Sequence, residues 1–126
     1  MYRGTRYYGK RMIMDISKDL IAASATPLIL AILGEGENYG YAIIKRVKEL
    51  SDGCMQWTDG MLYPVLHRLE SQNLIESEVR QSEQGRDRKY YRIKKQGTTV
   101  LHNYKEQWNT VYATLQKVWE ARPCLS

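Results

Sequence analysis

The stretch TDGMLYPVLHRLESQ, residues 58–72, decides the fold because its two sides need different surroundings. Apolar residues recur on one side at i, i+3, i+4 and i+7, which predicts a short amphipathic helix packed on a core. These residues are Leu62, Val65, Leu66 and Leu69. The other side carries Met61, Tyr63, Pro64, His67 and Arg68, a set that can touch base edges, thymine methyl groups or phosphates. We therefore predict that one face packs and the other reads DNA; an ordinary surface helix is the alternative.

The start of this helix also has recognisable signals. Thr58 is a suitable N-cap, and Asp59 suits the positive end of the helix dipole. Pro64 is compatible with a helix only near its first turn, so the helix is expected to begin just before the residues that would face DNA. We count Thr58 and Gly60 among the candidate DNA-binding residues.

Two further helices are predicted upstream. Residues 15–33 carry a broad apolar face, with either a kink or a division into two pieces after Thr26, because Pro27 follows. A second helix over about 39–50 is expected to bury Ile43, Ile44, Val47 and Leu50. Three helices in this order favour a helix-turn-helix core, and Tyr39 joins the candidate DNA-binding residues.

After Asn73 the apolar period changes from 3.6 to 2, which predicts a β-hairpin. Ile75, Ser77 and Val79 alternate with charged residues, and a polar tip at 82–87 contains a glycine. Six of the ten residues at 86–95 are Lys or Arg, and one is acidic. A solvated edge strand protected by charge would show the same composition. Directly after a DNA-reading helix, we interpret the hairpin as a wing on DNA, with Arg86, Arg88 and Lys89 as candidate contacts.

The last predicted element is one long helix over about 96–121. Its apolar residues are spaced 3, 4, 3, 4 and 3, which is typical of a coiled-coil seam. They are Leu101, Tyr104, Trp108, Val111, Leu115 and Val118, and Tyr112 and Trp119 widen the seam. A second copy of the same helix is the partner that we predict, giving a two-fold dimer. A helix folded back over its own domain is the alternative.

Composition bounds the function further. The chain has 126 residues and a formal charge of +5, which fits one domain with an acidic partner such as double-stranded DNA. Two cysteines, Cys54 and Cys124, have no metal-ligand spacing. We expect no metal, no cofactor and no enzyme activity, since His67 and His102 lack neighbouring catalytic groups and no glycine-rich phosphate loop occurs. No apolar run is long enough to cross a membrane, so a cytoplasmic protein is expected.

Three motifs give a more specific indication. They are NYGYAIIK at 38–45, DGMLYPVLHRLE at 59–70, and LIES at 74–77 followed by GRDRKYYRI at 85–93. In this order and spacing the chain resembles the PadR family of bacterial transcriptional regulators, over roughly residues 20–119. Its single C-terminal helix is similar to the compact branch that includes multidrug-responsive repressors. The sequence departs from the usual family pattern at Asp59, Met61 and Lys94.

The resemblance implies a homodimeric, nucleoid-associated repressor that binds a palindromic operator and is released by a small planar aromatic effector. It places Tyr63 and Pro64 in the DNA groove and Arg88 and Lys89 on the wing. It also places Trp108 at the dimer centre as an effector contact; a plain core residue is the alternative. The full set of candidate effector contacts is Trp108, Tyr104, Tyr112, Leu20 and Ala23.

The fold predicted from these elements is mainly α with a small β-hairpin, a winged helix-turn-helix with a long C-terminal dimerisation helix. Residues 1–14 are basic and are expected to be a disordered arm or a non-native extension. Residues 15–95 would form the DNA-binding domain, 96–121 the dimerisation helix and 122–126 a tail. A protein-interaction module without specific DNA binding is the alternative function, because a winged-helix scaffold does not dictate its use.

Overall fold

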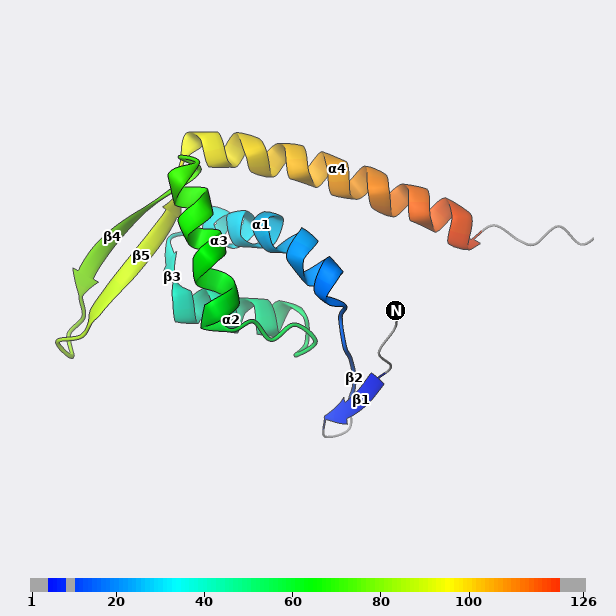
Figure 1. The fold of residues 1–126 in the computed structure, drawn as a ribbon, viewed down its shortest axis with the longest axis horizontal. Coiled ribbons are helices and arrows are strands. Elements are labelled where there is room, and N and C mark those ends of the chain that lie inside the picture. The colour runs from blue at the N-terminus through cyan, green and yellow to red at the C-terminus, as the bar shows by residue number, and fades with distance from the viewer. Residues whose placement is uncertain (1–4, 9–10, 121–126) are drawn as a thin grey trace, which may run out of the picture.

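The computed structural model describes residues 5–8 and 11–120, with side chains from Met14 onward. Figure 1 shows helix α4 running along one side of the molecule with α1 beside it, while α3 crosses α1 and the hairpin β4–β5 projects outward. The elements are β1 (Thr5–Tyr8), β2 (Arg11–Met14), α1 (Lys18–Glu35), β3 (Asn38–Tyr39), α2 (Gly40–Leu50), α3 (Asp59–Ser71), β4 (Ile75–Gln81), β5 (Asp87–Ile93) and α4 (Lys95–Glu120). The predicted winged helix-turn-helix with a long last helix is confirmed.

The core lies where α1, α2 and α3 meet. Helix α1 is buried on more than one side, because α2, α3, β5 and α4 all contact it, and this explains its broad apolar face. The fully buried side chains of the core are Ile29, Leu30, Leu33, Ile43, Val47, Leu62, Leu66, Leu69 and Ile75. Helix α1 continues through Pro27, so the division after Thr26 does not occur, and a kink at this proline stays a prediction. The expectation that Leu50 is buried was wrong, because this residue is exposed at the end of α2.

The wing belongs to a three-stranded antiparallel sheet of order β3-β5-β4. Its register pairs Ile75 with Ile93 at one end and Gln81 with Asp87 at the other. Gly85 has φ +79° at the tip, a backbone conformation that glycine adopts without strain. The change of apolar period after Asn73 therefore predicted the hairpin correctly.

Helix α4 begins in close contact with the rest of the domain. A Cβ atom on Gly97 would lie 2.2 Å from the backbone oxygen of Leu74, so only glycine fits there. The amide of Lys94 donates to that same oxygen at 2.9 Å. The first turns of α4 are thus held against the start of the wing, and its C-terminal half extends past the body of the domain (Figure 1).

The N-terminal prediction needs correction. Residues 5–8 and 11–14 form two antiparallel strands, with Thr5 paired to Met14 and Tyr8 to Arg11, whereas a disordered arm was expected. Both strands contain residues with a high preference for strands, such as Tyr7, Tyr8 and Ile13, and pairing with a second strand satisfies their backbone groups. The remainder of the predicted arm, residues 1–4 and 9–10, and the predicted tail at 122–126 lie outside the described residues.

Candidate nucleic-acid interface and effector cleft

The N-terminal end of α3 is exposed and well capped. Thr58 Oγ1 accepts a hydrogen bond from the amide of Met61 at 3.3 Å, as the N-cap prediction requires. Gly60, Pro64 and His67 are exposed, whereas Met61 is half-buried and packs against the core. Pro64 is the sixth residue of α3, so it leaves the carbonyl of Gly60 without its helical donor. Because Gly60 is exposed, water can bind that oxygen.

Tyr63 is only partly available to a ligand. A Cβ on Gly40 would lie 2.3 Å from the hydroxyl oxygen of Tyr63, so the phenol ring rests directly on the first residue of α2. Its residue remains 37% exposed. The ring of Tyr63 therefore packs α3 against α2. Part of this residue is still open to solvent, so the predicted contact with a DNA groove is compatible with this packing.

Three cations of the wing lie beside α2 and α3. The guanidinium carbon of Arg88 lies 4.5 Å from the centre of the Tyr39 ring, and Tyr39 meets Tyr90 edge to face at 5.3 Å. Lys89 Nζ lies 4.0 Å from Glu70 Oε1 of α3, and the side chain of Arg86 is exposed near the tip, with no ion pair among the described residues. Together with residues of α2 and α3, these cations line a concave surface of about 420 Å³. Its lining residues are Tyr39, Gly40, Tyr41, Tyr63, Arg86, Asp87, Arg88 and Lys89.

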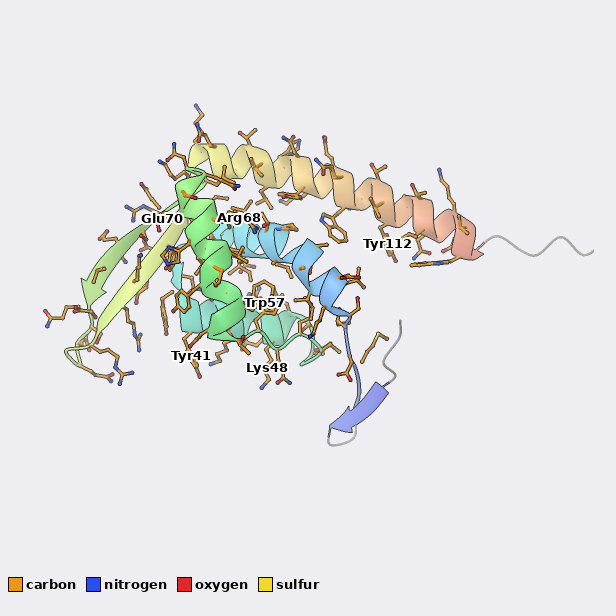
Figure 2. The ribbon with its side chains drawn as sticks, in the orientation of Figure 1. Tyr41, Lys48, Trp57, Arg68, Glu70 and Tyr112 are labelled. Atoms are coloured by element: carbon orange, nitrogen blue, oxygen red, sulfur yellow. The ribbon has the colours of Figure 1, made fainter. Side chains whose placement is uncertain are left out.

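The sequence prediction did not include Tyr41. This residue is 70% exposed, lines the same concave surface, and points away from α4 in Figure 2. Its place two residues after Tyr39, on the polar side of α2, was the signal available in the sequence.

Other cations of the basic hairpin are neutralised by carboxylates. Arg80 forms a two-pronged contact with Glu37, each nitrogen to oxygen distance being 2.8 Å, and also contacts Glu78 at 3.3 Å. Arg92 Nε lies 2.8 Å from Glu76. The hydrogen bond from Arg80 holds the pKa of Glu37 below its ordinary value. The cations open to an acidic partner are therefore those near the tip, and the strand register, which sets Glu76 opposite Arg92, is the reason.

Besides the ion pair of Lys89 with Glu70, a hydrogen bond and a buried ring connect the wing to α3. Glu70 accepts a hydrogen bond from the hydroxyl of Ser77 at 2.5 Å, and Tyr91 is buried in the core between the elements. Burial raises the pKa of Tyr91 to about 12, so its phenol stays protonated near neutral pH. These contacts join the C-terminal part of α3 to the base of the wing.

Arg68 is exposed on α3, and its contact with DNA stays a prediction. Its guanidinium turns toward α1 and donates from Nη2 to Thr26 Oγ1 at 2.7 Å. Thr26 is buried and needs a partner for its hydroxyl, and Arg68 on the crossing helix is long enough to supply one. The apolar period of residues 58–72 placed Arg68 on the same side as His67, but it contained no information about a partner on α1.

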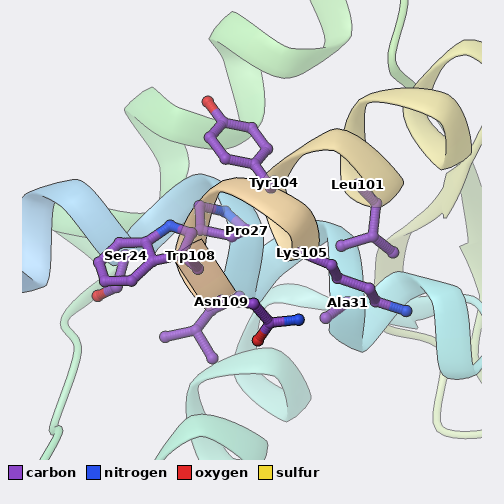
Figure 3. Close-up of a pocket in the computed structure, with 9 residues that line it drawn as sticks. Ser24, Pro27, Ala31, Leu101, Tyr104, Lys105, Trp108 and Asn109 are labelled. Atoms are coloured by element: carbon purple, nitrogen blue, oxygen red, sulfur yellow. The ribbon is translucent and has the colours of Figure 1, made fainter. Parts of the chain in front are cut away.

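A second cavity of about 450 Å³ lies between α1 and α4. Figure 3 shows side chains of the two helices facing each other across it. It is lined by Ser24, Pro27, Leu28, Ala31, Leu101, Tyr104, Lys105, Trp108 and Asn109, and we name it the α1–α4 cleft. Of the predicted effector contacts, Trp108 and Tyr104 line this cleft. Tyr112, Leu20 and Ala23 do not, and all three are exposed further along the two helices.

The predicted dimer seam divides into two parts. Leu101 is 8% exposed and packs into its own domain, so its assignment to the interface was wrong. Tyr104 also packs against the domain core, and Trp108 is half-buried in the cleft. The remaining seam residues, Val111, Leu115, Val118 and Trp119, are exposed in the single chain.

The described residues hold no group of three or more His, Cys, Asp or Glu side chains placed to bind a metal. Within the same residues, helices lack the length and apolar character that crossing a membrane requires.

Comparisons with known proteins agree with this architecture. The model of the family described as "Transcriptional regulator PadR-like family" matches residues 29–103. "Uncharacterized protein X" of Lysinibacillus sphaericus is 30% identical over 96 residues, which are 76% of this chain and 88% of that protein. "Transcriptional regulator YqjI" of Escherichia coli is 34% identical over 80 residues, 64% of this chain and 37% of that longer protein.

Solved structures are similar over most of the chain. A transcriptional regulator from Clostridium thermocellum has a TM-score of 0.74 and 31% identity, covering 81% of this chain and 96% of that one. A PadR-like regulator from Bacillus cereus has a TM-score of 0.73 and 27% identity, covering 83% of this chain and 100% of that one. The family consists of transcriptional regulators and not of enzymes. The chain belongs to the PadR-like family of transcriptional regulators.

Proposed function

We propose that this protein is a repressor that binds a palindromic operator as a homodimer and leaves it when a planar aromatic effector binds. The observation that carries the proposal is the concave surface where the exposed end of α3 meets Arg86, Arg88 and Lys89 of the wing. Arg86 is exposed, and Arg88 and Lys89 lie over tyrosine rings. Such cations suit phosphates, and the neighbouring end of a helix suits a major groove.

In this proposal the contacts divide into two kinds. The wing cations bind phosphates and supply most of the affinity, which makes binding strongly dependent on salt. Gly60, Pro64 and His67, with the exposed edge of Tyr63, contact bases and contribute to selection. A homodimer sets two such surfaces about 34 Å apart, one helical turn of DNA.

The dimer is proposed from the exposed apolar residues in the second half of α4. Val111, Leu115 and Val118 lie three and four residues apart, the spacing at which two helices interdigitate. A second copy is the partner of matching length and pattern, and its helix would bury the same residues on both chains.

The effector site is proposed in the α1–α4 cleft. Trp108 and Tyr104 provide aromatic surface, and Lys105 and Asn109 provide polar groups at its edge. A planar molecule between α1 and α4 would change the spacing of the two DNA-reading helices, and a coupling of about 1–3 kcal/mol suffices for release. In fluorescence titrations with acridine and anilinonaphthalene sulfonate, we expect saturable quenching that Trp108→Ala abolishes. Quenching that is absent in the native protein, or equal in both proteins, contradicts the cleft.

The DNA-binding proposal is tested by replacing Arg88 and Lys89 with Gln and measuring fluorescence anisotropy with the DNA next to the gene. We expect affinity to fall about 10- to 100-fold, and the slope of log affinity against log salt to fall by about 2, because each lost phosphate contact removes about 0.9. Lys18→Gln with Lys95→Gln is the matched control, since it removes two exposed cations elsewhere and should change affinity less than about twofold. Salt-independent binding by the native protein would contradict the proposal.

A further inference from the structure

The contact between Arg68 and Thr26 joins the DNA-reading helix to the wall of the α1–α4 cleft. We propose that this pair is the positioning link through which occupation of the cleft moves α3 and weakens DNA binding. The inference rests on the proposed function, and it identifies the residues by which the two sites communicate.

The contact is well suited to hold one helix in a defined place on another. Arg68 Nη2 and Thr26 Oγ1 are 2.7 Å apart and belong to residues 42 positions apart in the chain. Thr26 is 8% exposed and is the one polar residue among the buried residues that the structure describes. A short hydrogen bond from a charged donor is directional, whereas the apolar contacts around it tolerate sliding.

Thr26 is directly followed by a residue of the cleft. Pro27, Leu28 and Ala31 line the cleft on the side of α1 that faces α4, and Thr26 faces α3. Helix α1 therefore lies between the α1–α4 cleft and the contact of Thr26 with Arg68 on α3. Figure 1 shows α1 with α4 on one side and α3 crossing it, and Figure 2 labels Arg68 at this crossing.

The same point of α1 is able to bend. Proline has no amide hydrogen, so the carbonyl of Ala23 lacks the donor that residue 27 would normally supply, and the helix ladder is interrupted there. The hydroxyl of Ser24 donates to the carbonyls of Leu20 and Ile21 at 2.7 and 3.2 Å, within the same turn. An occupant that pushes Pro27 away from α4 therefore displaces Thr26 with it.

Displacement of Thr26 reaches the DNA surface through Arg68. Either the hydrogen bond stretches and leaves a buried hydroxyl without its partner, or α3 follows α1. Since Arg68 lies one turn after Pro64, a shift of α3 changes the position of its exposed end relative to the wing. An occupied cleft thus favours an arrangement that fits the operator less well.

The test fills the cleft with a side chain, so that no effector needs to be known. Ala31→Phe places a ring in the cleft, and Ser24→Trp does the same at its rim should the first variant fail to fold. Each cleft-filling substitution is made in three backgrounds, which are the native pair, Arg68→Gln and Thr26→Val. The affinity of every variant for the operator is measured by fluorescence anisotropy. With the native pair we expect filling to weaken binding about tenfold, and with either replacement less than about twofold.

Controls separate coupling from stability. Thr26→Ser keeps the hydroxyl and should restore the tenfold effect, while thermal unfolding of every variant identifies losses that come from folding alone. A purely structural role for Arg68 would lower affinity equally with the cleft open or filled. The proposal is overturned if filling costs the same in all backgrounds, or if it costs nothing with the native pair. Failure of the native protein to bind DNA at all would instead refute the proposed function.

Discussion

The two halves of α4 continue one apolar spacing but lie in different surroundings. In the first half Gly97 and Leu101 are buried and Tyr104 packs on the core. In the second half Val111, Leu115 and Val118 are 51%, 40% and 70% exposed. A periodic apolar stripe therefore indicates that a helix packs against a neighbour, but it does not indicate which neighbour covers each part of the stripe.

The lengths of the helices explain where the change occurs. Helix α1 has 18 residues and α4 has 26, which correspond to about 27 and 39 Å. The two run antiparallel, because the cleft residue Leu101 lies near Gly34 whereas Trp108 and Ser24 line the same part of the cleft. Helix α1 begins at Lys18, so the last turns of α4 extend beyond it.

The largest effect that would sharpen this comparison is expected for Leu101→Ala. Removing this buried side chain leaves a cavity and should lower the free energy of unfolding by about 2–4 kcal/mol. Urea unfolding at several protein concentrations measures it, and the loss should not depend on concentration. Leu115→Ala is the matched control in the second half, and its effect should grow with concentration as a dimer forms. Equal, concentration-independent losses in both variants would remove the distinction between the halves.

The second prediction concerns assembly. Val111→Glu with Val118→Glu should leave each chain folded and convert the protein to single chains, because the charges repel across a two-fold contact. Sedimentation measures the mass, and operator affinity should fall about tenfold or more, since one half-site then binds alone. Thr110→Glu with Ala113→Glu adds the same charge on the opposite side of the helix and should change neither. If the seam variant keeps the native mass, the second half of α4 is not a dimer surface.

The smallest effect concerns Tyr91, which is buried beside α3, and it is tested with pH. The pKa of Tyr91 is about 12 in the folded chain and 10.0 as an unperturbed tyrosine, so the folded state holds this proton more tightly. Its contribution to stability is therefore complete below pH 10 and is lost as the pH rises through 12. Unfolding of the native protein and of Tyr91→Phe should diverge over this range. If the free energy of unfolding changes equally with pH in both proteins from pH 9 to 12, Tyr91 is not the group whose ionisation lowers stability in this range.

Local patterns predicted much of the fold. The 3.6 period located α2 and α3 closely, Thr58 marked the start of α3, and the change to a period of 2 located the wing. These signals are readable because the geometry of a helix or strand repeats over neighbouring residues. The surface of Arg86, Arg88 and Lys89 followed from the same reasoning, since all three lie close together in the sequence.

Other features depended on residues far apart in the chain. Arg68 turned to Thr26, and Glu37 neutralised Arg80, each across more than 40 positions. No periodicity encodes such a pairing, because it arises only when separate elements cross.

Local sequence patterns specified α1 to α4 and the hairpin β4–β5, and the motifs indicated the family, whereas β1, β2 and β3 were not predicted. The packed fold sets which apolar residues of α4 belong to the domain's own core and which cations remain open to a partner. The physical reason is that backbone geometry is set within a few residues, whereas burial and charge neutralisation depend on distances that exist only after the helices and the sheet have packed.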